Sequence, residues 1–116
     1  MESRLIYSVL NSGNLKIEWR SNTEEEWIYI GIEKEIKTEK IISHIEEEFK
    51  EDSFYIALER TTSKELKKTE IEAEIITRIG KDNFKISNLT FDKVIEFNKI
   101  GVMRIGRKKK TTANKG

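Results

Sequence analysis

Several residue types that carry common chemistry are absent or scarce in this sequence. It contains no cysteine and a single histidine, His44. Disulfides, thiolate metal sites and cysteine catalysis are therefore excluded. No apolar run approaches the roughly 18–20 residues that a membrane-spanning helix needs, and no apolar block of the signal-peptide type follows Met1. These absences lead us to expect a cytoplasmic protein that makes no contact with a membrane.

The motifs of the common enzyme classes are also missing. The segment 101–108 has the glycine spacing of a phosphate-binding loop, but Arg107 and Lys108 replace its required lysine and Ser/Thr. His44 and Glu47 have a spacing that can place two metal ligands on one helix face. With no second histidine and no cysteine, we expect His44 to be a partly exposed helix residue instead. We predict a protein without enzymatic activity, cofactor or metal.

Length and composition favour one domain with a thin core. The chain has 116 residues, of which 36% are hydrophobic and 37% charged. Residues 1–58 carry 13 acidic and 7 basic side chains, whereas residues 59–116 carry 8 and 15. Such segregation can give a molecule an acidic and a basic pole. We assign residues 1–106 to a single domain and 107–116 to a basic, disordered C-terminal tail.

The first part of the chain alternates like β-strands. Residues 4–10, 15–20 and 27–32 have apolar positions at a period of two and are separated by polar, turn-forming connections. We predict that they form a three-stranded antiparallel meander. Trp19 and Trp27 flank the second connection and are expected near each other. They would either roof the core as an aromatic pair, which we favour, or form a platform for bases or a protein partner.

The run Ser53–Arg60 organises the centre of the sequence. It is apolar on both of its alternating faces, so we predict a strand in the interior of the sheet. The preceding residues, from Thr38 to about Lys50, repeat their apolar positions at helical spacing. A helix followed by a buried strand is therefore expected here.

The segment that follows fits two interpretations. Residues 69–79 alternate like a strand, but Ile71, Ile75 and Ile79 also repeat every four residues as in a helix, with a capping box from Thr69 to Glu72. The run 75–79 matches 41–45 at its apolar positions, and each run precedes a strand-like segment. This likeness favours two helix–strand units.

The end of the domain is predicted to be a hairpin. Residues 91–99 have the spacing of a helix, but β-branched and aromatic residues favour strands at 93–97 and 102–105. The expected fold class is α+β. It comprises the antiparallel three-stranded meander, the two helix–strand units and the C-terminal hairpin, with the helices packed on one face of the sheet.

Two acidic runs are candidates for binding a protein partner. They are Glu24, Glu25 and Glu26 at a connection, and Glu46, Glu47 and Glu48 on an outward helix face. In open water these carboxylates lack the apolar setting that catalysis requires, but they can complement a basic partner. The leading hypothesis is a small non-enzymatic protein that acts by occupying a partner's surface. A bacterial immunity-type (toxin-neutralising) protein is one concrete version, and a homodimer through an edge strand is another form of association.

The alternative hypothesis is an accessory nucleic-acid-binding protein. It would use the basic C-terminal strand and tail, through Arg104, Arg107, Lys108, Lys109 and Lys110. Such residues neutralise phosphates and give an affinity that falls with salt. The tail contains no aromatic residues for stacking on bases, so a solvated terminus is the competing interpretation.

Overall fold

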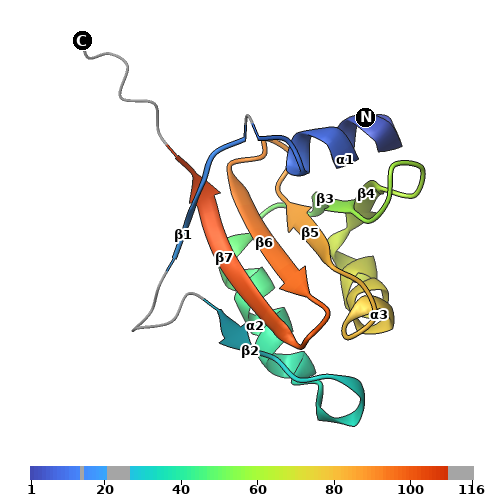
Figure 1. Cartoon of the computed structure of the whole chain (residues 1–116), viewed down its shortest axis with the longest axis vertical. Coiled ribbons are helices and arrows are strands. Elements are labelled where there is room, and N and C mark those ends of the chain that lie inside the picture. Colours follow the sequence, from blue (N-terminus) through green and yellow to red (C-terminus); the bar gives the residue numbers. More distant parts are fainter. Residues whose placement is uncertain (14, 21–26, 110–116) are drawn as a thin grey trace.

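The computed structural model describes residues 1–13, 15–20 and 27–109, which form an antiparallel sheet with helices on both faces (Figure 1). In chain order the elements are α1 (Ser3–Leu10), β1 (Ile17–Trp19), β2 (Ile28–Tyr29), the 3-10 helix η1 (Glu33–Glu35), α2 (Thr38–Glu48), β3 (Ser53–Ala57), β4 (Lys64–Lys67), α3 (Lys68–Arg78), β5 (Phe84–Ser87), β6 (Lys93–Asn98) and β7 (Val102–Lys108). The predicted α+β class is confirmed.

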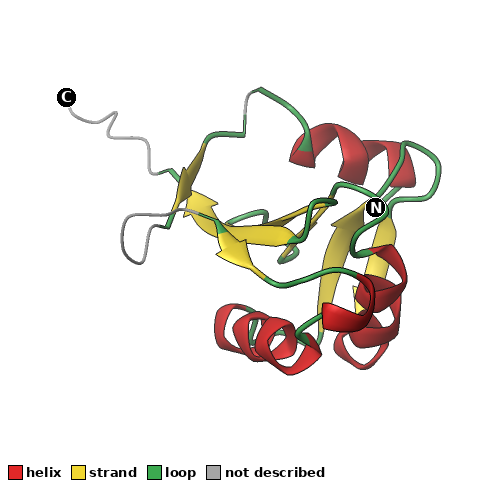
Figure 2. Cartoon of the chain, turned by 60° about the horizontal axis from the view of Figure 1, so that its bottom comes forward, coloured by secondary structure: helices red, strands yellow, loops and turns green. Residues whose placement is uncertain are grey.

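The central strands follow the order β1-β7-β6-β5-β3-β4, and β2 also pairs with β7. Figure 2 shows the sheet between two layers, with α2 and α3 on one side and the N-terminal α1 on the other. The prediction that all helices share one face is therefore wrong. It failed because α1 was expected to be a strand, so nothing was assigned to cover the second apolar face.

Strand β3 has the interior position that its two apolar faces predict. It lies between β4 and β5. Phe54 and Ile56 belong to the large apolar cluster beneath α2 and α3, whereas Tyr55 and Ala57 belong to the smaller cluster beneath α1. β3 therefore contributes to the core on both faces of the sheet, beneath α2 and α3 and beneath α1.

Both predicted helix–strand units are present. α2 leads into β3 and α3 leads to β5, and the two strands pair so that Ile56 lies opposite Ile86. The α3 segment is a helix because Ile71 and Ile75 both point into the core. Its start differs from the expected capping box, since the Glu70 carboxylate accepts a hydrogen bond of 2.9 Å from the Lys67 backbone N–H. Strand β4, which we did not predict, directly precedes α3.

The N-terminal segment is a helix rather than the predicted strand. Residues 5–10 are apolar at every position except Ser8, so their pattern is compatible with both periods. In the structure Ile6 and Leu10, four residues apart, are the buried pair. The Asn11 side chain donates a 2.9 Å hydrogen bond to the Tyr7 carbonyl at the end of this helix. Tertiary packing against β3 decides between the two periods.

The predicted meander is also wrong, because β1 and β2 both pair with β7 and not with each other. Gly106 of β7 makes the β1 pairing feasible. A Cβ atom there would lie 2.4 Å from Ile17 Cγ2 and 2.7 Å from Trp19 Cε3, closer than side chains tolerate. The absence of a side chain at this position lets two bulky residues of β1 pack across β7.

The C-terminal hairpin of β6 and β7 is confirmed. β7 continues to Lys108, so the first two residues assigned to the tail are part of the sheet. The Lys109 N–H extends the pairing of β7 with β1 by donating a 2.8 Å hydrogen bond to the Lys16 carbonyl. Residues 110–116 lie outside the described ranges.

Candidate binding face of the sheet

The described helices cover only part of the sheet face on the α1 side. α1 packs over β3 and lies across one end of the sheet (Figure 1). There Ile6 and Leu10 contact an apolar surface formed by Tyr55, Ala57 and Val94. Beyond α1, the same face continues over β6 and β7 with polar and aromatic side chains.

The alternation of β7 explains how polar groups reach this face. Met103 and Ile105 enter the core beneath α2 and α3, so the intervening Arg104 points to the α1 side. Glu96 lies opposite Arg104 on β6, and Lys85 lies opposite Glu96 on β5. All three charged side chains are half-buried. A charged row therefore crosses three strands. It starts at Lys85, whose Nζ donates a 3.0 Å hydrogen bond to the Leu10 carbonyl at the end of α1, and it reaches Arg104 beyond the helix.

Arg104 is the centre of an aromatic cluster on this face. Its guanidinium carbon lies 3.9 Å from the ring centroid of Trp19 and 4.5 Å from that of Trp27. Its Nε donates a 2.8 Å hydrogen bond to Glu96 Oε1, and the exposed fractions of these two side chains are only 22% and 21%. We call Trp19, Trp27, Arg104 and Glu96 the tryptophan–arginine cluster. Cation–π contacts of this kind contribute about 0.5–2 kcal/mol each, more when desolvated.

The expected proximity of Trp19 and Trp27 is confirmed, and both rings contact the Arg104 guanidinium. Trp19 also packs at the margin of the apolar cluster beneath α1, which agrees with the core interpretation. Trp27 is half-buried and contacts the guanidinium. The two rings and the guanidinium therefore contact one another on this face.

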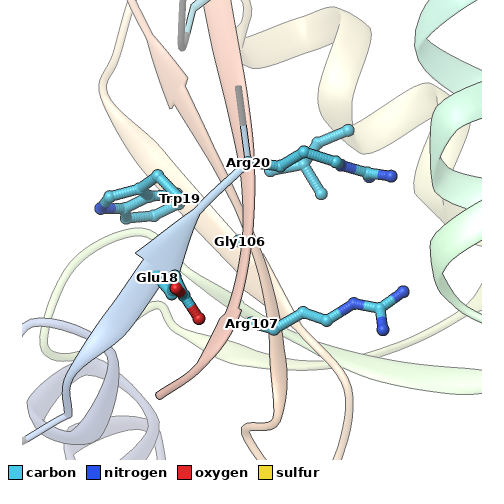
Figure 3. A pocket seen from close by; sticks show the side chains of 6 residues that line it. Glu18, Trp19, Arg20, Gly106 and Arg107 are labelled. Carbon is cyan, nitrogen blue, oxygen red and sulfur yellow. The ribbon is translucent and has the colours of Figure 1, made fainter. Parts of the chain in front are cut away.

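A cavity of about 310 Å³ lies beside this cluster, along the pairing of β1 with β7 (Figure 3). It is lined by Glu18, Trp19, Arg20, Ile105, Gly106 and Arg107. In Figure 3, Arg20 and Arg107 extend to one side of the strands and Trp19 to the other. The lining residues thus contribute an aromatic ring on one side of the sheet and two guanidinium groups on the other.

A buried carboxylate pairs with the two arginines that line the cavity. Glu48, the last residue of α2, is only 2% exposed. Its Oε2 accepts a hydrogen bond from Arg20, and its Oε1 lies 3.7 Å from Arg107 Nη2. The C-terminus of a helix disfavours a negative charge, so the two arginines supply the compensation that this position needs. Glu48 therefore ties α2 to the β1–β7 edge.

The prediction that Glu46, Glu47 and Glu48 all lie on an outward helix face is wrong for Glu48. Glu46 and Glu47 are exposed, but Glu48 is buried in its ion pairs and cannot meet a partner's surface. Glu48 faces Arg20, which follows β1, and Arg107 of β7; the local sequence pattern did not indicate this. The other candidates, Glu24, Glu25 and Glu26, lie outside the described residues.

The structure divides the basic candidates between different surfaces. Arg104 belongs to the tryptophan–arginine cluster on the α1 side, whereas Arg107 lies on the opposite side near Glu48. Lys108 and Lys109 are exposed, and Lys109 is held next to Lys16 by a backbone hydrogen bond. Lys110 lies outside the described residues. Arg104 and Arg107 thus make contacts within the fold, whereas Lys108 and Lys109 are exposed at the end of the sheet.

His44 is a half-buried residue of α2. Burial lowers the pKa of His44; the charge of Glu47 opposes this, while Arg20 and Lys40 lower the pKa further. Among the described residues, no three side chains of the His, Cys, Asp or Glu type gather in a way that could hold a metal ion. Nor is any described helix long and apolar enough to cross a membrane.

Comparison with protein-family models, curated proteins and solved structures gave no match. The sequence predicted that Trp19 and Trp27 lie near each other, but it did not link Arg104 to them. One signal was available: Arg104 is a charged residue flanked by apolar neighbours in a predicted strand.

Proposed function

We propose that the protein is a non-enzymatic binding module that occupies a partner protein's surface through the tryptophan–arginine cluster. The observation that carries this proposal is the position of Arg104 between Trp19 and Trp27 on the uncovered half of a sheet face. Tryptophan, arginine and tyrosine are the residues most enriched among interface hot spots. Tyr29, which is 49% exposed, lies on the neighbouring strand β2.

Preorganisation supports the same proposal. The Arg104 side chain is held by Glu96 and by two rings, so little side-chain freedom remains to be lost when a partner binds. An immunity-type inhibitor is one concrete form of such a protein. In that case the exposed carboxylates of Glu46 and Glu47 would add complementarity to a basic partner.

The test of this function is affinity capture from the native host with the wild-type chain and a matched pair of variants. Trp27→Ala removes one wall of the cluster, whereas Leu5→Ala removes a side chain that is 52% exposed on α1. We expect a stoichiometric protein partner with wild type and Leu5→Ala. Trp27→Ala should weaken the affinity at least about 30-fold, which corresponds to a hot-spot loss of about 2 kcal/mol. A partner that binds both variants equally would count against this surface.

One observation favours nucleic-acid binding as a second candidate. One end of the β1–β7 pairing carries three exposed basic residues, Lys16, Lys108 and Lys109. Trp19 lies further along β1. Basic side chains beside an aromatic ring can track a single strand and stack a base. The opposing fact is that Glu96 already neutralises Arg104.

The two candidates separate by salt dependence. If single-stranded RNA is the ligand, Lys108→Gln should reduce the slope of log affinity against log salt by about 0.7, as expected for the loss of one phosphate contact. If no RNA binds at low salt, this candidate is wrong. It is also wrong if RNA binds but Lys108→Gln does not change the affinity.

A further inference from the structure

Strand β1 is an edge of the sheet with backbone groups directed outward. The Arg20 N–H donates to the Ile105 carbonyl at 2.7 Å, and the Lys16 carbonyl accepts from the Lys109 N–H at 2.8 Å. In an antiparallel pair the residues that bond to the partner strand alternate along the chain. The N–H and C=O groups of Ile17 and Trp19 therefore point away from β7, where no described strand pairs with them.

The two edges of the sheet differ in how they are protected. β4, at the far edge, carries exposed charges at Lys64, Glu65 and Lys67, a pattern that discourages the addition of a strand. β1 and the residues beside it carry their exposed charges, Lys16, Glu18 and Arg20, on one face only, and the half-buried Ile17 and Trp19 lie on the other face.

The charges around β1 specify the chemistry of an added strand. The exposed basic residues nearby are Lys16, Arg20, Arg107, Lys108 and Lys109, whereas Glu18 is the one exposed acidic side chain of β1. Arg107 is 67% exposed, and its nitrogen lies 3.7 Å from Glu48, too far for a hydrogen bond. Its guanidinium is therefore able to pair with an incoming carboxylate.

The same charges argue against a second copy of the chain as the occupant. In the two-fold antiparallel pairing that keeps all three residues of β1 in register, Glu18 would face its own copy and Lys16 would face Arg20. Like charges directly opposite each other on neighbouring strands are destabilising. A segment with carboxylates in place of these groups avoids the repulsion.

We infer that the outer edge of β1 binds an extended, acidic segment of a partner protein as an additional strand of the sheet. The backbone of the segment would bond to Ile17 and Trp19, and its carboxylates would meet Arg20 and Arg107. This mode is strand addition, in which main-chain hydrogen bonds supply affinity and side-chain pockets supply specificity. The inference rests on the proposed protein-binding function and specifies the partner's form and charge.

The test uses the full chain and short synthetic peptides, monitored by amide NMR shifts and hydrogen exchange. A peptide of alternating Glu and Val is the probe, with an alternating Lys and Val peptide as the charge control. A third peptide repeats the acidic sequence with alternate backbone amides N-methylated on the bonding edge. We expect the acidic peptide to shift and protect the amides of Ile17 and Trp19, and each control to bind at least about tenfold more weakly, the equivalent of 1.4 kcal/mol.

A pair of variants tests the arginine. Arg107→Gln should weaken the acidic peptide severalfold, whereas Lys81→Gln, an exposed residue in the turn after α3, should leave its affinity unchanged. Both side chains are exposed, but Arg107 also compensates the buried charge of Glu48, so circular dichroism checks that each variant keeps the fold.

Four results would overturn the inference. These are equal binding of the N-methylated peptide, absence of any shift at Ile17 and Trp19 at millimolar peptide, an effect of Lys81→Gln equal to that of Arg107→Gln, and a concentration-dependent dimer that protects the same amides without peptide. A single-stranded RNA that shifts these amides while the acidic peptide does not would assign the edge to nucleic acid. Trp27→Ala should spare peptide binding at β1, so failure of the edge and failure of the tryptophan–arginine cluster are distinguishable.

Discussion

The two faces of the sheet differ in how completely they are covered. The face toward α2 and α3 is closed by a continuous apolar layer that includes Phe54, Ile56, Ile86 and Ile95, each essentially inaccessible to solvent. The face toward α1 is apolar only beneath that short helix and becomes charged and aromatic around Arg104. The larger apolar cluster lies on the closed face, and the half-open face carries the surface that we propose for binding.

The largest expected effect comes from the closed face. Phe54 is fully buried and its ring stacks on Phe49 at a centroid distance of 5.6 Å. We expect Phe54→Ala to lower the free energy of unfolding by about 3–5 kcal/mol. Val94→Ala, its counterpart on the α1 side, removes fewer atoms from a smaller cluster and should cost about 1–3 kcal/mol. Urea denaturation measures both, and an equal loss would contradict the asymmetry of the two faces.

The next effect concerns the ion pair that joins the two layers. Glu48→Gln removes the charge that Arg20 and Arg107 compensate, and should cost about 1–2 kcal/mol because both arginines remain partly solvated. Glu47→Gln is the matched control, since Glu47 is an exposed neighbour on the same helix. It should change the free energy of unfolding by less than about 0.5 kcal/mol. Similar losses for the two variants would mean that Glu48 is not a structural tie.

A smaller loss of stability is expected at the half-open face. Arg104→Met keeps much of the side-chain bulk but removes the contacts with both tryptophans and with Glu96. We expect a loss of about 1 kcal/mol together with a change in the near-ultraviolet circular dichroism of the tryptophans. Lys99→Met, in the exposed turn before β7, provides the comparison. An unchanged tryptophan signal in Arg104→Met would show that the cluster is not preorganised.

The smallest effect comes from an ion pair on the outer side of the helix layer. Burial raises the pKa of Glu74, but hydrogen bonds and charges from Arg78 and Lys64 outweigh it, so the pKa is lowered. A carboxylate with a lowered folded-state pKa stabilises the protein above its unfolded pKa, and this contribution is lost as the pH falls through the folded value. Glu74→Gln should therefore cost less than about 1 kcal/mol at neutral pH. The difference from wild type should shrink in acid, and a difference that grows below pH 4 would refute the assignment.

Sequence reasoning succeeded where local pattern and tertiary environment agree. Ile71 and Ile75 have helical spacing and a core to enter, and Ser53–Ala57 has two apolar faces and two layers to cover them. It failed for residues 4–10, whose apolar positions fit both a strand and a helix. It also failed for Glu48, because the arginines that allow its burial are remote in sequence.

The candidate site shows the same limit. Trp19, Trp27 and Arg104 could each be noticed from the sequence, but their contact depends on β1 and β2 pairing with β7 rather than with each other. That choice is made by shape, since Gly106 leaves room for Ile17 and Trp19. Steric fit between distant segments is not encoded in the period of either segment.

By itself the sequence determined the α+β class, the interior position of Ser53–Ala57, the two helix–strand units and the closing hairpin, because each depends on periodicity within a short window. Only the tertiary structure decided that α1 covers the second face, that Glu48 is buried between arginines, and that Arg104 joins two tryptophans beside an open edge. These features arise from competition between distant segments for the same partners, which packing and charge compensation settle once the whole chain has folded.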